Sequence, residues 1–121
     1  MPENWDIKLR YKTRMTRELN NLKDVVKDLP NTQVDVHLFQ LGAGFNLDKL
    51  ENMGDKEFSN FMIKESEQKP IKATTSQENI GVFITAKPTK GRGEAIDYFC
   101  TGESFVAQAK DIKQTLVDAY A

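Results

Sequence analysis

The 121-residue sequence contains one cysteine, one histidine and one tryptophan. A lone cysteine, Cys100, excludes an intramolecular disulfide, which is typical of proteins that fold in a reducing compartment. Together with the single histidine, His37, it falls short of the four Cys or His ligands of a structural zinc site. We therefore expect a fold held by a hydrophobic core, with no metal and no cofactor.

The sequence also lacks a long apolar run and an excess of charge of one sign. No segment approaches the roughly 18 apolar residues of a membrane span, and the N-terminus has no secretory-signal pattern. Seventeen Lys and Arg against eighteen Asp and Glu give a formal net charge of −1, which argues against a general coat for nucleic acid or membrane surfaces. We expect a cytoplasmic protein without membrane contact, folded as a single domain over residues 1–121.

The spacing of apolar residues predicts the secondary structure. Alternation with a period of two predicts strands, and a continuous apolar run predicts a strand that is covered on both faces. Spacings of three and four residues predict amphipathic helices. Strands are expected at Trp5–Lys12, Gln33–Leu41, Ile80–Ala86 and Glu94–Thr101, and long helices at Thr13–Asp28 and Phe105–Tyr120. One or two short helices are expected between Asn46 and Ile63, and the region 71–78 suits either a short edge strand or a turn.

This order of elements, β-α-β-α-(β)-β-β-α, predicts an α+β fold. We expect a mostly antiparallel sheet of four to five strands, in which the last two strands form a hairpin around loop 87–93. The helices are expected to cover one face of this sheet as a two-layer sandwich.

Loop 87–93 is the most informative local pattern. It carries three cations and two glycines without an acidic residue, and such a loop can hold a phosphate through side chains and backbone N–H groups. A solvated hairpin tip is the alternative interpretation. The candidate ligand-binding residues of this loop are Lys87, Lys90 and Arg92.

A second basic stretch lies in the first predicted strand. Lys8, Arg10 and Lys12 share one strand face, which suits an acidic partner or a phosphate-bearing ligand. The alternative interpretation is a solvated face on which these cations pair with acids of a neighbouring strand, such as Asp35 or Asp97.

An apolar cluster on the short helix is the candidate partner-binding surface. A short helix rarely needs so much apolar area to dock, so a band of this kind suits a dimer or partner interface. Its residues are Phe58, Phe61, Met62 and Ile63.

A catalytic role has little support in the sequence. His37 and Cys100 would form a thiolate–imidazole pair only if their strands were neighbours. A buried cysteine behaves as a small apolar residue in most folds. We therefore expect a protein that is not an enzyme.

Together these features favour a small non-catalytic protein-interaction module of the inhibitor, immunity or adaptor type. Its partner would be another protein or a second copy of the chain. The alternative is a binding protein for an anionic ligand, a nucleotide or a short nucleic-acid segment, held by loop 87–93 and the Lys8/Arg10/Lys12 face. Because the net charge is close to zero, a protein partner is favoured over nucleic acid.

Overall fold

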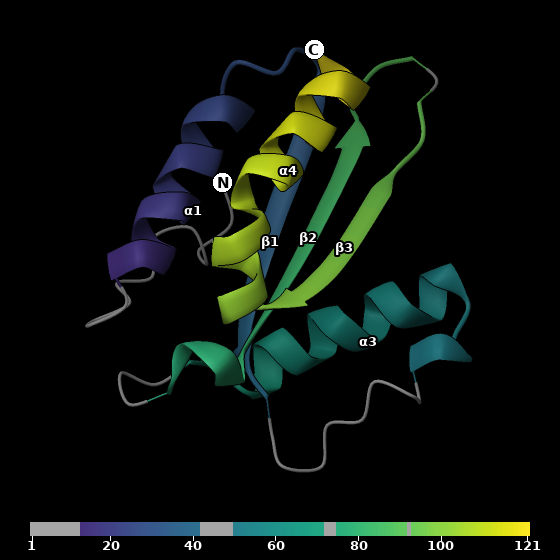
Figure 1. Ribbon diagram of the computed structural model, residues 1–121. Helices are drawn as coiled ribbons and strands as arrows, with labels where there is room; N and C mark the ends of the chain where they lie inside the picture. The colour runs from purple at the N-terminus through teal and green to yellow at the C-terminus, as the bar shows by residue number, and fades with distance from the viewer. Residues whose placement is uncertain (1–12, 42–49, 72–74, 92) are drawn as a thin grey trace.

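The computed structural model describes residues 13–41, 50–71, 75–91 and 93–121 (Figure 1). This part of the chain is α+β, as the sequence predicts. A single turn of 3-10 helix lies at Gln77–Asn79. The other elements are α1 (Thr13–Val26), β1 (Thr32–Gln40), α3 (Asp55–Gln68), β2 (Ile80–Pro88), β3 (Ile96–Thr101) and α4 (Gly102–Tyr120).

The strands form an antiparallel sheet in the order β1–β2–β3. β1 pairs with β2 over its whole length, from Thr32 opposite Pro88 to Gln40 opposite Ile80. The expected hairpin of β2 and β3 is also present. The described residues form three strands, fewer than the expected four to five. The predicted strand at Trp5–Lys12 lies outside the described residues, and the described positions of 71–78 form no strand.

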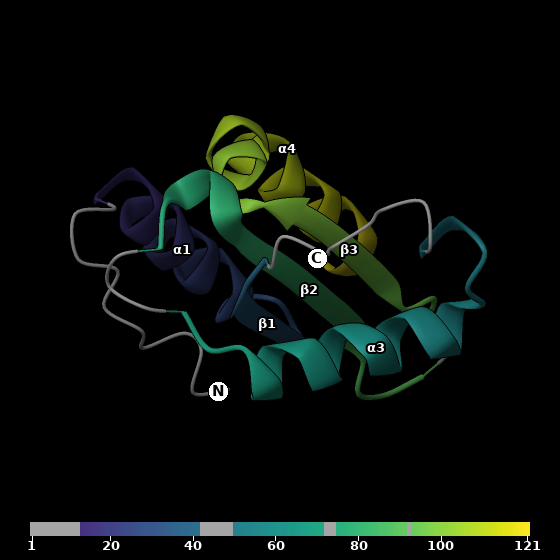
Figure 2. The same ribbon diagram turned by 90° about the horizontal axis from the view of Figure 1, so that it is seen from below.

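Helices cover both faces of the sheet, so the prediction of a two-layer sandwich is wrong. Figure 2 shows α1 and α4 side by side on one face and α3 crossing the other. β2 can pack against helices on both faces because its alternate side chains point to opposite faces and nearly all of them are apolar. Val82 and Ile84 face α1 and α4, whereas Phe83 faces α3. The sequence prediction that this strand is covered on both faces is confirmed.

The main core lies between the sheet and the α1/α4 pair. The apolar residues of α1 and α4 recur every three or four positions, so each helix turns one continuous apolar side toward the strands. The largest buried side chains of this core are Met15, Leu22, Leu38, Ile80, Ile84, Phe105 and Leu116.

A smaller core lies between the sheet and α3. Phe39, Met62 and Phe83 are fully buried there. The ring of Phe39 lies above Gly81, where a side chain is absent, and stacks against Phe99 of β3 at a centroid distance of 6.0 Å. The aromatic residues therefore gather at one end of this sheet face, beneath α3.

The ends of α4 are tied to the sheet. At its start, Thr101 caps the helix by accepting a hydrogen bond from the Ser104 backbone N–H at 3.2 Å. At its end, the Tyr120 hydroxyl donates to the carbonyl of Glu94 at 2.7 Å and contacts that of Ala86 at 3.2 Å.

None of the helices in the described ranges combines the length and the apolar character needed to cross a membrane.

Candidate functional site

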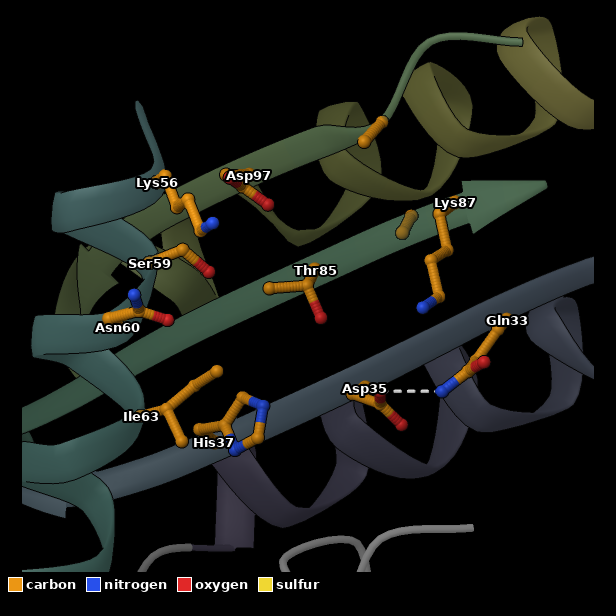
Figure 3. A pocket seen from close by; sticks show the side chains of 12 residues that line it. Gln33, Asp35, His37, Lys56, Ser59, Asn60, Ile63, Thr85, Lys87 and Asp97 are labelled. Atoms are coloured by element: carbon orange, nitrogen blue, oxygen red, sulfur yellow. Dashed lines mark hydrogen bonds between the residues drawn. The ribbon is translucent and has the colours of Figure 1, made fainter. Parts of the chain in front are cut away.

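The part of the sheet beyond the aromatic cluster forms a polar groove of about 490 Å³ beside α3 (Figure 3). Its floor comes from the three strands and its wall from one side of α3, on which residues three and four positions apart lie together. We call it the polar groove. Its main lining residues are Gln33, Asp35 and His37 of β1, Thr85 and Lys87 of β2, Asp97 of β3, and Lys56, Ser59, Asn60 and Ile63 of α3.

Strand register sets the order of the charges on the floor. Thr85 lies opposite Asp35 on one side and opposite Asp97 on the other. The two carboxylates therefore belong to one cross-strand row, with backbones roughly 10 Å apart at the usual strand spacing. Lys87 belongs to the next row, opposite Gln33. Acidic and basic groups thus alternate within one short stretch of sheet.

His37 lies where the polar part of the floor meets the aromatic cluster. Its ring stacks against Phe83 at a centroid distance of 6.0 Å. Burial lowers the pKa of His37 below 6.5, although the negative charges of Asp35 and Glu67 act in the opposite direction. The imidazole is therefore neutral near pH 7 and offers the groove one hydrogen-bond donor and one acceptor.

The groove carries charges of both signs. Asp35 accepts a hydrogen bond from Gln33 Nε2 at 3.0 Å, which orients its carboxylate. Lys56 and Lys87 are exposed, and neither forms an ion pair within the described part of the chain. The described lining residues thus include two lysines, two aspartates and a neutral histidine, so groups of both signs face the groove.

Of the three cations in the predicted basic loop, the structure describes Lys87 and Lys90. Lys87 belongs to β2 and lines the polar groove. Lys90 lines a different depression, beside Tyr120 at the end of α4. The four other predicted ligand-binding cations lie outside the described residues: Arg92, Lys8, Arg10 and Lys12. The basic cluster as a whole therefore stays a prediction, and the two described lysines line different depressions.

The apolar band predicted as a partner surface is largely used inside the molecule. Met62 is fully buried, and Phe58, Phe61 and Ile63 pack against the smaller core. The ring of Phe58 meets Phe83 edge-on at 5.6 Å. The surplus of apolar side chains on this helix is explained by its docking on the second sheet face, which the sequence prediction left uncovered.

His37 and Cys100 lie on opposite faces of the sheet and do not form a pair. His37 lines the polar groove, whereas Cys100 lies in the main core. Burial raises the pKa of the Cys100 thiol to about 12. Near neutral pH the thiol is therefore protonated, and it is also buried.

A second depression lies between β3 and α4, and sequence reasoning missed it. Its floor is apolar, and its rim is polar and includes the hydrogen bond from the Tyr98 hydroxyl to Gln108. Its volume is about 120 Å³. We call it the β3–α4 crevice. Its residues are Ile84, Ile96, Ile112 and Leu116 on the floor and Tyr98, Gln108, Asp111 and Thr115 on the rim.

One signal for the polar groove was present in the sequence. Along one face of β1, the polar Gln33, Asp35 and His37 give way to Phe39, so only part of that face is built for burial. Lys56 had no such signal, because its place depends on where α3 docks.

Among the described residues there is no group of three or more His, Cys, Asp or Glu able to hold a metal ion. No family model matches the chain, and neither do the curated proteins nor the solved structures with which it was compared.

Proposed function

We propose that the protein is a non-catalytic interaction module that binds a partner protein at the β3–α4 crevice. The observation that carries this proposal is the size and lining of the crevice. Small-molecule sites usually have volumes of roughly 300–1,000 Å³, well above the 120 Å³ of this one. A cavity of about 150 Å³ holds a benzene ring, which is slightly more than the crevice offers, so the crevice suits the end of one large apolar side chain.

The surroundings of the crevice suit an anchor residue of a protein interface. Such residues fill small desolvated pockets near the centre of a contact and carry most of its binding energy. Tyr98 stands on the rim, and tyrosine is enriched in interfaces because it combines an apolar ring with a polar end. Ile96 and Tyr98 are only half-buried, so apolar surface is exposed along this edge.

Charge on the rim indicates the chemistry of the partner. Asp111 lines the crevice and is exposed, and none of the lining residues is a cation. Burial raises the pKa of the Tyr98 hydroxyl, and the negative charge of Asp111 raises it further. The matching partner segment therefore carries a large apolar side chain next to Lys or Arg, as expected for a target of an inhibitor, immunity or adaptor protein.

A peptide-display experiment tests this function. Random peptides are selected on the wild-type protein and then measured against Thr115→Trp, which fills the crevice from its rim. The matched control is Ala107→Trp, an exposed position of α4 outside the crevice.

We expect enriched peptides with one large apolar residue beside a cation. Their affinity should fall at least tenfold with Thr115→Trp and stay unchanged with Ala107→Trp, since one anchor side chain commonly contributes 2 kcal/mol or more, on the order of a tenfold effect or larger. Peptides that bind wild type and Thr115→Trp equally, or a failure to enrich any sequence, would contradict the proposal.

A further inference from the structure

The polar groove suits a different kind of ligand from the crevice, and we propose that it binds a small dipolar molecule of the amino-acid type, with one carboxylate and one ammonium group. This site lies on the opposite face of the sheet and does not depend on the proposed protein interaction. Its volume of about 490 Å³ lies within the usual range for small-molecule sites.

The charges of the groove discriminate between classes of ligand. An anion near Lys87 also faces the carboxylate of Asp35 in the neighbouring row, which repels it. A cation in the groove would be repelled in the same way by Lys56 and Lys87. A ligand that carries both charges satisfies both sets of groups, so the mixed charges of the lining favour a dipolar molecule over the anion that the basic loop predicted.

The positions of the charged groups allow one ligand to reach both signs. Figure 3 shows Lys87 and Asp35 over neighbouring strands at one end of the groove, and Lys56 reaching from α3 toward Asp97 at the other. Lys87 is available to a carboxylate because it forms no ion pair with the described residues. Asp35 is oriented by Gln33 and is available to an ammonium group through its remaining lone pairs.

Uncharged groups complete the site. The hydroxyl of Thr85 stands between the two carboxylates, and Ser59 and Asn60 face it from α3. These groups both donate and accept hydrogen bonds, and the neutral His37 does the same. They suit the amide or hydroxyl groups of a polar side chain on the ligand.

The test is a titration followed by two-dimensional amide NMR of the full chain. Each common α-amino acid is added at millimolar concentration, and the tightest binder is compared with its deaminated acid and its decarboxylated amine. We expect shifts of the amides of Asp35, Thr85 and Ser59. We also expect the dipolar compound to bind about tenfold more tightly than either counterpart, the loss typical of one charge-assisted contact.

Single substitutions separate the two charges. Lys87→Met should weaken binding of the amino acid and of its acid counterpart but not of the amine. The isosteric Asp35→Asn should weaken binding of the amino acid and of the amine but not of the acid. Lys90→Met, outside the groove, and Thr115→Trp, in the crevice, should change none of these affinities. The dispersion of the same spectra shows that each variant is folded.

Two results would overturn this proposal. If the acid counterpart binds as tightly as the amino acid and Asp35→Asn does not weaken the amino acid, the groove is a simple anion site. If no amino acid shifts the groove amides, the groove is a solvated sheet face. Neither result bears on the crevice, whose function is tested separately.

Discussion

The ring of Phe39 occupies the space above Gly81, where a Cβ atom on the glycine would lie only 2.6 Å from Phe39 Cζ. Phe39 is fully buried and stacks against Phe99, so its ring has little room to move away. The missing side chain at position 81 thus lets an aromatic residue of β1 reach across the central strand to β3.

Gly81→Ala should destabilise the protein by about 1–3 kcal/mol, the usual cost of forcing extra volume into a packed core. Urea denaturation measures the change in the free energy of unfolding. The control is Gly54→Ser at the exposed N-cap of α3, where a Cβ meets no atom within 4 Å and only a few tenths of a kcal/mol are expected. Equal stability of Gly81→Ala and wild type would contradict this packing.

Cys100 should resist thiol reagents in the folded protein. Its pKa of about 12 leaves roughly one thiol in 10⁴ ionised at pH 8, and the side chain is only 8% exposed. Because Cys100 is the only cysteine, a colorimetric thiol assay reports on this residue alone. We expect almost no reaction in buffer and one equivalent in guanidinium. Rapid reaction of the native protein would place the thiol outside the core.

His37 should make stability depend on pH on the acidic side of neutrality. Its pKa in the folded protein lies below the unfolded value of 6.5, so the unfolded chain takes up the proton first as the pH falls. The stabilising contribution of neutral His37 is therefore complete above pH 6.5 and is lost as the pH falls toward the folded pKa. His37→Asn should remove this part of the pH dependence in urea denaturation.

The lowered pKa of His37 can be measured directly by proton NMR. His37 is the only histidine, so one imidazole signal titrates. A midpoint above 6.5 would show that the nearby acids outweigh burial and would reverse the predicted pH dependence.

Tyr120→Phe should loosen the end of α4. The hydroxyl contacts the carbonyls of Glu94 and Ala86, and its loss should cost about 1–2 kcal/mol because the carbonyls lose a partner. Tyr98→Phe is the matched control, since Tyr98 donates to Gln108, an exposed side chain that can bond to water instead. Thermal unfolding should show a larger decrease for Tyr120→Phe than for Tyr98→Phe, and the reverse order would contradict this assignment.

The helices and strands of the described residues could largely be predicted because each carries a local pattern. The continuous apolar run from Ile80 predicts a strand that is covered on both faces of the sheet. Spacings of three and four residues predict α1 and α4. The side on which α3 docks could not be predicted. Phe58 and Met62 show that one side of this helix is buried, but spacing does not say against which face of the sheet.

The sites were harder to predict than the elements. The polar groove depends on Thr85 lying opposite both Asp35 and Asp97, and this register follows from strand pairing and not from any local pattern. The β3–α4 crevice depends on how far α4 extends over Tyr98 and Ile96. Such distances depend on the packing of whole elements. The sequence therefore shows which residues could bind a ligand, but it does not show which of them lie together.

β2 is shared by two cores of unequal size, and this gives the molecule an order in which its parts open. Detachment of α3 alone uncovers the smaller core around Phe39 and Phe83, while the sheet stays closed beneath α1 and α4. The backbone amides in the middle of β2, such as that of Val82, lie between two paired strands and reach solvent only when the sheet itself comes apart. Local unfolding of this kind proceeds in cooperative units of different free energy. We therefore expect α3 to exchange its amide protons through a partial opening, and the centre of β2 only through complete unfolding.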